Sequence, residues 1–212
     1  MSLPQTLLSD LERMKGMQKY AKREQKIDAI LQSLKTLNYL SRSQIQTLHD
    51  LKGDRNAQKF LKSMDEYLNS FRDGETIYYL SKEGRERIDC PRVIKKTTTA
   101  RHYIMRNALY IAFGEPETWR NEQRVRHKVA TIICDATFVD GGTRYLIEID
   151  HEQKMTANKI KMEKYRKLIE ANAFGNNPVQ IVWMTTTEYR RKQLEKLCEG
   201  LNAQIFIITD FQ

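Results

Sequence analysis

Apolar side chains recur at helical spacing through the first third of the chain. Residues 25–38 place five of them on one helix face: Ile27, Ile30, Leu31, Leu34 and Leu37. The run Ser41-Arg-Ser-Gln44 is typical of a capping box and predicts that a second, short helix begins there. Asp54 follows Gly53 as an N-cap, which predicts a third helix to about Asn69. Its apolar stripe contains Ala57, Phe60, Leu61, Met64 and Leu68.

A hairpin is predicted directly after the third helix. Asp73-Gly74 is a strong turn signal, and it separates Leu68–Arg72 from Thr76–Leu80. Ser81 then caps a short helical segment that ends near Asp89. Three helices followed by a two-stranded wing predict a winged helix-turn-helix domain over residues 25–90.

The outward face of the third helix has the chemistry of a DNA-reading surface. Arg can read guanine, Asn and Gln can read adenine, and Lys can neutralise phosphate. We therefore expect base contacts from Arg55, Asn56, Gln58 and Lys59, and phosphate contacts from Lys62, Arg42 and the wing residues Arg72 and Lys82. Two alternatives remain open: a basic face that is merely solvated, and a winged helix that contacts protein.

The remaining segments predict an α+β protein. Residues 1–24 form an amphipathic arm that packs either on its own domain or on a partner subunit. Residues 91–114 form a linker and a connector helix, Thr99–Phe113. Residues 115–212 alternate strands and helices, which indicates a sheet covered on at least one face. The strands are expected at Ala130–Cys134, Ala136–Val139, Tyr145–Ile149, Val179–Met184 and Gln204–Thr209, and the helices at Thr156–Ala173 and Glu188–Gly200.

Carboxylates cluster at the ends of the predicted strands of this second domain. Asp135 ends one strand, and Glu148 and Asp150 lie on one face of another because strand side chains alternate. Oxygen ligands of this kind suit Mg²⁺ or Mn²⁺, which can activate water for attack on a phosphoryl group. The three carboxylates are therefore candidate metal ligands.

Here the sequence resembles the PD-(D/E)XK nuclease fold, in which a helix, a β-meander, a helix and a further strand carry an Asp and a Glu-x-Lys motif. Asp135 is followed by a gap of 12 residues and then Glu148-Ile149-Asp150, so Asp150 stands where that fold has its catalytic lysine. The resemblance implies that Asp135, Glu148 and a lysine of the next helix form the catalytic set. Lys161, one turn from Tyr165, is preferred to Lys154 and Lys159, and Glu122 matches an extra carboxylate from the first helix. An active nuclease, a relic used for DNA contact or dimerisation, and an acidic cluster on an unrelated α/β domain all remain open.

From about Gln25 onward the chain is similar to the replication-relaxation family of plasmids and other bacterial mobile elements. The resemblance rests on IYYLSKEGRERI, on Trp119 to Glu122, on Asp135, on YLIEIDHEQK, on the pair Lys161 and Tyr165, and on VWMTTTEYRRKQL. It implies an accessory DNA-binding role in plasmid replication and DNA relaxation. It does not by itself imply catalysis.

Composition narrows the function classes further. The net charge of +9 favours a polyanionic partner. Three separated cysteines and four isolated histidines match neither a disulfide framework nor a zinc site. The apolar runs are too short to span a membrane, and the charged N-terminal residues do not resemble a signal peptide, so we expect a cytoplasmic, plasmid-associated protein.

The sequence thus predicts a duplex-DNA-binding accessory factor of a mobile element. We expect no cofactor, or Mg²⁺ or Mn²⁺ if the nuclease-like site is functional. A homodimer on a palindromic or repeated site and a replication or relaxase protein are the expected partners, with no membrane contact. A metal-dependent endonuclease or nickase, and a transcriptional repressor of a mobile element, are the alternatives.

Overall fold

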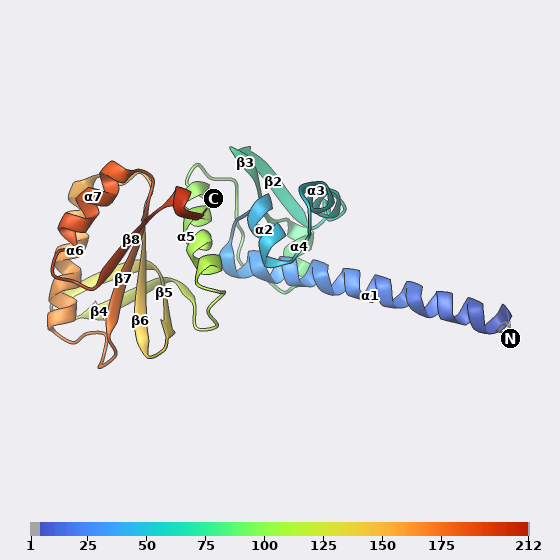
Figure 1. The fold of residues 1–212 in the computed structure, drawn as a ribbon, viewed down its shortest axis with the longest axis horizontal. Helices are drawn as coiled ribbons and strands as arrows, with labels where there is room; N and C mark the ends of the chain where they lie inside the picture. Colours follow the sequence, from blue (N-terminus) through green and yellow to red (C-terminus); the bar gives the residue numbers. More distant parts are fainter. Residues whose placement is uncertain (1–4, 212) are drawn as a thin grey trace. The chain divides into compact units, whose positions relative to one another are not determined.

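The computed structural model describes residues 5–211, with side chains described from residue 13. The chain folds into two compact units, residues 1–96 and 97–212. Helices and strands occur in both units, so the chain has the predicted α+β class (Figure 1). Within the described part of the chain, no helix is both long and apolar enough to cross a membrane.

Unit 1 combines helices with a small antiparallel sheet. Its three strands have the order β1-β3-β2, and the hairpin register pairs Leu68 with Leu80 and Asp73 with Glu75. Gly74 makes the tight turn with φ 71°, a conformation that favours glycine. The elements are α1 (Gln5–Leu37), β1 (Leu40–Ser41), α2 (Arg42–Leu48), α3 (Asp54–Lys62), β2 (Leu68–Asp73), β3 (Glu75–Leu80) and α4 (Lys82–Arg87).

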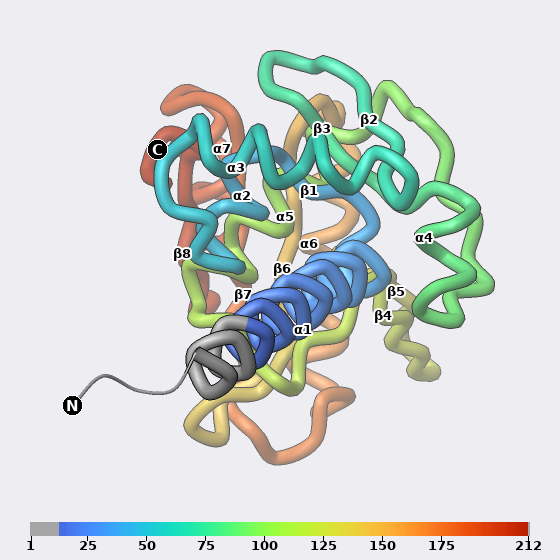
Figure 2. Tube along the Cα trace, turned by 90° about the vertical axis from the view of Figure 1, so that its right-hand side faces the viewer, coloured from blue at the N-terminus to red at the C-terminus, as the bar shows by residue number. Residues whose placement is uncertain are grey.

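Helix α1 continues through the segment that the sequence analysis treats as a separate arm. The predicted helix over 25–38 begins instead at Gln5, so the described part of residues 1–24 and the predicted first helix are one element (Figure 2). Good helix formers without an intervening proline explain the continuity. The five predicted apolar residues of its C-terminal half are buried: Ile27, Ile30, Leu31, Leu34 and Leu37. Residues 1–4, and the side chains of Leu7, Leu8 and Leu11, lie outside the described residues.

Side-chain caps fix the short helices of unit 1. The predicted capping box is present: Ser41 accepts a hydrogen bond from the Gln44 N–H, and the Gln44 side chain accepts from the Ser41 N–H. Ser81 likewise accepts from the Gly84 N–H and starts α4. A Cβ atom on Gly84 would lie 2.2 Å from the Tyr67 carbonyl oxygen, so only glycine allows this close backbone approach.

The third helix is shorter than predicted. Its N-cap is Gly53 rather than Asp54, and it ends at Lys62 rather than near Asn69. The Ser63 hydroxyl donates to the Phe60 carbonyl oxygen, and Leu68 already pairs with β3, so strand pairing takes over from helix propagation. Met64 and Leu68 are nevertheless buried, as their place in the apolar stripe predicts.

Unit 2 is a mixed sheet covered by helices on both faces. The five strands have the order β4-β5-β6-β7-β8; β4, β5 and β6 are antiparallel, whereas β6, β7 and β8 are parallel. The elements are α5 (Ala100–Ala112), β4 (Arg120–His127), β5 (Ala130–Asp140), β6 (Thr143–Asp150), α6 (Met155–Glu170), β7 (Val179–Thr185), α7 (Glu188–Leu197), β8 (Ala203–Ile207) and the 3₁₀ helix η1 (Ile208–Phe211).

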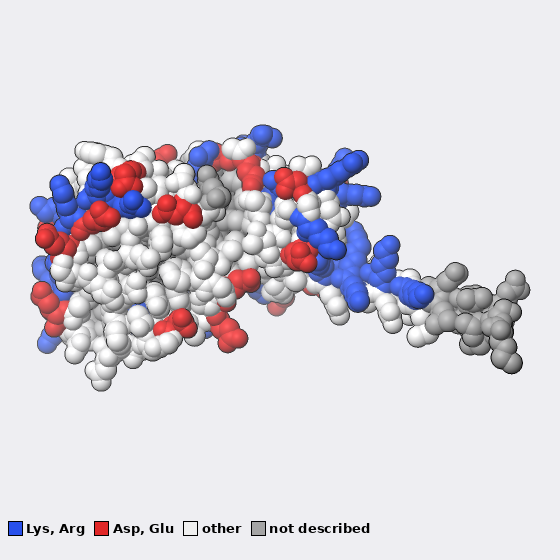
Figure 3. Space-filling model, in the orientation of Figure 1, with Lys and Arg blue, Asp and Glu red and all other residues white. Residues whose placement is uncertain are grey.

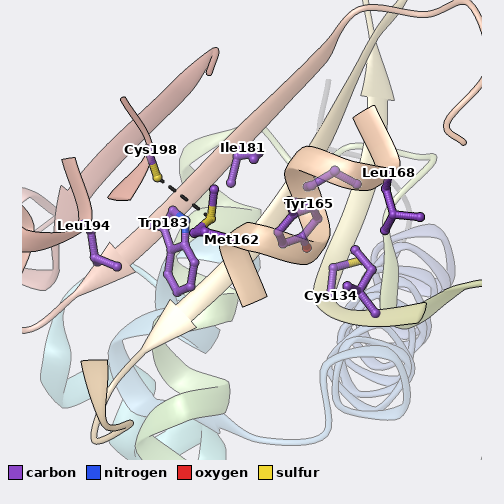
Figure 4. Close-up of a cluster of buried hydrophobic side chains, with 10 residues drawn as sticks. Cys134, Met162, Tyr165, Leu168, Ile181, Trp183, Leu194 and Cys198 are labelled. Atoms are coloured by element: carbon purple, nitrogen blue, oxygen red, sulfur yellow. Dashed lines mark hydrogen bonds between the residues drawn. The ribbon is translucent and has the colours of Figure 1, made fainter. Parts of the chain in front are cut away.

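Each face of this sheet has its own core. Helices α6 and α7 cover one face, where Met162, Tyr165, Leu194 and the buried Trp183 belong to one core cluster (Figure 4). Helix α5, predicted as a connector, packs on the other face through Met105 and Leu109, against Phe138 and Ile147 among others.

Three local predictions in unit 2 are wrong. The resemblance to the nuclease fold places Glu122 on the first helix, but Glu122 lies on strand β4. The strands expected at Ala130–Cys134 and Ala136–Val139 are one strand, β5, and Asp135 lies within it rather than at an end. Glu122 has φ 52° and interrupts the β4–β5 pairing opposite Asp135. On β5, Cys134 belongs to the core on one face and Ala136 to the core on the other, so the break in pairing coincides with a change of face.

Candidate nucleic-acid interface and carboxylate site

Helix α3 separates an apolar face from a cationic one. Ala57 and Leu61 are buried, whereas five polar side chains on the rest of its surface are exposed: Arg55, Asn56, Gln58, Lys59 and Lys62. Lys and Arg side chains gather at this part of unit 1 (Figure 3). The predicted reading face is therefore available to solvent in unit 1, and its role in DNA recognition stays a prediction.

Two of the residues predicted to contact DNA also link α2, α3 and the turn between them. The Asn56 Nδ2 donates to the Leu51 carbonyl oxygen at 2.7 Å and so fixes the turn before α3. Arg42 Nη1 lies 2.8 Å from Asp54 Oδ1 and donates to Gln46 Oε1 at 2.8 Å, which links α2 to the start of α3. The hydrogen bond from Arg42 and its charge lower the pKa of Asp54. Substituting Asn56 or Arg42 would therefore alter the fold of this motif as well as its surface.

Arg72 and Lys82, which the sequence analysis predicts as wing residues, are exposed on the β2–β3 hairpin and just after it. Arg72 lies on β2 and pairs with Thr76 next to the hairpin turn. Lys82 opens α4, where its Nζ lies 3.8 Å from Glu86 Oε1. Both side chains extend into solvent, as contact with a DNA backbone would require.

In unit 2, the sequence-predicted pair on α6 meets the predicted carboxylate on β6. Lys161 donates to Glu148 Oε2, and Tyr165 donates to Glu148 Oε1. Glu148 and Tyr165 are fully buried, while the Lys161 side chain is 21% exposed. The one-turn spacing of Lys161 and Tyr165 allows both to reach the same carboxylate.

Asp135 forms the second carboxylate of this site. Its Oδ1 lies 3.2 Å from His102 Nε2 on α5, and its Oδ2 accepts from the Ile149 N–H at 2.7 Å. Burial opposes ionisation, but the His102 hydrogen bond, the charge of Lys161 and the Ile149 N–H together lower the pKa of Asp135. Asp135 is therefore the ionised member of the site.

The pKa of Glu148 is shifted upward, whereas that of Asp135 is shifted downward. Full burial and the neighbouring charge of Asp135 raise the pKa of Glu148 to about 8, against the opposing effect of Lys161. The pKa of Lys161 is raised, because Glu148 and Asp135 together outweigh the cost of burying its charge. Burial and Glu148 also raise the pKa of Tyr165, which stays a neutral donor. Lys161 thus carries a positive charge, and this charge lowers the pKa of both Asp135 and Glu148.

Asp150, at the position of the catalytic lysine in the nuclease fold, has a different set of partners. Its two oxygens accept from Arg190 at 2.6 and 2.7 Å, and Asn158 and Thr185 each donate at 2.8 Å. Burial opposes ionisation, but these donors, Arg190 first among them, lower the pKa of Asp150. The buried carboxylate holds α6, α7 and the ends of β6 and β7 together.

Two of the three carboxylates predicted as metal ligands share a lysine neighbour, and the third does not. Asp135 and Glu148 share Lys161 as a neighbour, whereas Asp150 is surrounded by Arg190, Asn158 and Thr185. Among the side chains that the structure describes, no group of three or more His, Cys, Asp or Glu residues is placed to hold a metal ion. Mg²⁺ is commonly held by one or two carboxylates together with substrate phosphates, so a site at Asp135 and Glu148 stays a prediction.

Sequence reasoning misses two partners of these carboxylates. In the sequence His102 is an isolated histidine, and Arg190 is one of several charged residues on a predicted helix. Each lies more than 30 residues from its carboxylate in the sequence. The only signal for Arg190 is its place near the start of a helix that follows a buried strand.

The geometry defines an α+β protein in which a helical unit with a cationic helix precedes a mixed-sheet unit with a buried carboxylate–lysine site. A family model described as replication-relaxation matches residues 31–180. This match covers more than half of the chain, which therefore belongs to the replication-relaxation family. Membership associates the chain with replication or relaxation of plasmids and other mobile elements. No curated protein matches it.

Proposed function

We propose that the chain is a double-stranded DNA-binding accessory factor of a plasmid or other mobile element, acting in replication, in DNA relaxation or transfer, or in their control. The observation that carries the proposal is the exposed face of α3, where Arg55, Gln58 and Lys59 share an outward surface. Helices enter the major groove with such faces, and their N-terminal turns approach the base edges.

The surroundings of α3 support this assignment. Helices α1, α2 and α3 and the β2–β3 hairpin follow one another in the order of a winged helix-turn-helix. Arg72 and Lys82 are exposed on and beside the hairpin, where a wing tracks the phosphate backbone. A net charge of +9 strengthens attraction to DNA. Dimerisation would match a palindromic or repeated site.

The test starts from a plasmid-scale binding map that finds the preferred duplex. On that duplex, Lys62→Ala should weaken binding to all sequences alike and make the salt dependence shallower by about 0.9 in log K against log salt. Arg55→Ala should cost about 1–3 kcal/mol on the preferred site and relax base preference. Asn56 is a poorer probe, because it also holds the Leu51 carbonyl.

Lys164→Ala is the matched control, since Lys164 is an exposed lysine of α6 in the other unit. It should leave affinity and salt dependence close to wild type. If Lys62→Ala and Arg55→Ala behave like this control, α3 is not the DNA-reading element. The map also separates a repressor from a replication factor, because a repressor would occupy promoters rather than an origin.

Unit 2 favours a nuclease-like domain that lacks catalysis. Its order of a helix, three antiparallel strands, a helix and a parallel strand supports the resemblance to the PD-(D/E)XK core. Asp150 replaces the lysine of that motif, and its oxygens are bound to Arg190. A carboxylate in this state cannot orient or deprotonate an attacking water as an amine can.

Metal-dependent DNA cleavage is the second candidate function, because Lys161 reaches Glu148 from α6. Asp135 and Glu148 would hold Mg²⁺ or Mn²⁺ jointly with a DNA phosphate, and the metal would supply Lewis-acid activation of water. Purified protein with either metal should then nick plasmid DNA, and Asp135→Asn should abolish nicking while DNA binding persists. An Asn keeps the acceptor for the Ile149 N–H. Wild-type protein that leaves duplex and single-stranded DNA intact with both metals excludes this second function.

A further inference from the structure

The N-terminal half of α1 carries a row of lysines on one face. Lys15, Lys19, Lys22 and Lys26 are separated by four, three and four residues, which places them along one side of a helix with 3.6 residues per turn. The first three are exposed and line a shallow depression together with Gln18. We call these four residues the α1 lysine row.

Acidic residues do not offset the row. Between residues 13 and 26 the sequence contains a single acidic residue, Glu24. Its Oε2 lies 2.9 Å from Arg87 Nη2, and its Oε1 lies 3.2 Å from Arg23 Nη1. Glu24 therefore forms ion pairs with two arginines. It does not neutralise the lysines of the row.

The C-terminal end of the α1 lysine row lies beside the two ends of α3. Lys26 Nζ donates to the Asp50 carbonyl oxygen at 3.4 Å, in the turn before α3. Next to the row, Arg23 donates to Ser63 Oγ at 3.0 Å, at the end of α3, and its guanidinium lies 6.0 Å from the centre of the Phe60 ring. Blue side chains in Figure 3 extend along α1 from this part of unit 1. The cationic surface of α3 and the α1 lysine row thus lie on neighbouring elements of one unit.

The spacing of the row suits a phosphate backbone. Helix residues rise 1.5 Å each, so Lys15 and Lys26 lie about 16 Å apart along the axis. One DNA strand carries a phosphate about every 3.4 Å of duplex axis, so this length covers roughly five phosphates. An anionic membrane is the other surface that attracts a basic helix, but membrane binding requires an apolar stripe. The exposed apolar residues Met14, Met17 and Tyr20 form only a short strip, and residues 13–26 contain no Leu, Ile, Val, Phe or Trp to extend it.

We propose that the α1 lysine row binds the phosphates of duplex DNA that flanks the site read by α3. The inference rests on the proposed function, because it extends the same DNA surface. With the row bound to flanking phosphates, the N-terminal half of α1 lengthens the footprint beyond the base-reading contacts.

The experiment compares the full chain with a Lys15→Gln/Lys19→Gln/Lys22→Gln variant on two duplexes, one limited to the α3 site and one with flanking DNA on both sides. On the long duplex the slope of log K against log salt should become shallower by about 0.9 per lysine, or about 2.7 in total. Raising salt from about 50 to 200 mM should then cost the variant roughly 40-fold less affinity than wild type. On the short duplex the two proteins should bind alike.

Two further variants keep the result interpretable. Lys164→Gln/Lys167→Gln/Lys196→Gln removes the same charge from exposed positions of unit 2 and should leave both slopes unchanged. Lys15→Arg/Lys19→Arg/Lys22→Arg keeps the charge and should bind the long duplex like wild type, which separates charge loss from loss of helix.

The outcomes distinguish this inference from the proposed function. Wild-type protein that binds neither duplex overturns both. In a second outcome, the wild-type protein binds both duplexes and the glutamine variant has the wild-type slope on the long duplex. This result overturns the role of the lysine row and leaves the proposed function intact. A glutamine variant that loses binding to phosphatidylserine vesicles but keeps the wild-type DNA slope also overturns it and assigns the row to a membrane surface.

Discussion

Arg190→Ala should destabilise unit 2 by about 3–5 kcal/mol, because it leaves the fully buried Asp150 carboxylate without its cation. Asn158 and Thr185 would still donate, but neutral donors do not balance a buried charge. Urea denaturation followed by tryptophan fluorescence measures the loss, since Trp183 is in the core of this unit. Adding Asp150→Asn to Arg190→Ala should recover part of the stability, because the double variant has no unpaired charge.

The neighbouring arginine is the matched control. Arg191 pairs with Glu188 at 2.7 Å on the helix surface, and its side chain is 31% exposed. A surface pair of this kind contributes about 0–1 kcal/mol, so Arg191→Ala should have little effect. Equal losses for the two alanine variants would show that the Asp150–Arg190 pair has no special weight in the fold.

The stability of unit 2 should fall as pH rises from about 4.5 to about 8, because of Glu148. Its pKa is raised in the folded protein, so between these values the folded state keeps a proton that the unfolded state has lost. The stabilisation is complete below the unfolded pKa and is lost as pH rises through the folded one. At about 1.4 kcal/mol per pKa unit, the change over this range amounts to at most roughly 5 kcal/mol.

Glu148→Gln should remove this dependence, because an amide does not ionise in this range. The difference in free energy of unfolding, variant minus wild type, should therefore increase as the pH rises from 5 to 9. Glu152→Gln is the control, since the Glu152 side chain is 84% exposed and should leave the wild-type pH profile unchanged. A wild-type profile that rises through this range would show that Glu148 is ionised in the fold.

The two effects have one structural cause. Glu148 and Asp150 lie two residues apart on β6, and both are completely buried. Asp150 receives an arginine and stays ionised, whereas Glu148 shares one lysine with Asp135. One strand end therefore holds two carboxylates in different protonation states. Asp150 has a structural role, and Asp135, Glu148 and Lys161 remain the predicted catalytic set.

Most elements of unit 1 could be predicted from local sequence patterns. Ile27 to Leu37 repeat at helical spacing and are buried, and the capping box at Ser41 and the cap at Ser81 form as their residue types predict. Such features depend on contacts within a few residues. The extent of α3 is not readable in this way, because the pairing of Leu68 with Leu80 on β3 ends the helical pattern early.

The residues of the carboxylate site could be predicted only in part from the sequence. Lys161 and Tyr165 are expected on one helix face, and both reach Glu148. Asp135 is expected at a strand end, yet it lies within β5, opposite the residue at which the pairing with β4 is interrupted. A sequence pattern does not show where two strands lose their pairing, because that depends on the backbone of both.

The sequence by itself determined the α+β class, the cationic face of α3, the family resemblance and the residues of the carboxylate set, because each follows from periodicity or from short motifs. Only the tertiary structure decided that Asp150 pairs with Arg190, that Asp135 contacts His102 and that the α1 lysine row begins beside α3. These contacts join residues 24 to 40 positions apart in the sequence. The energy of a buried charge depends on the partners that folding brings to it, and no local pattern contains that information.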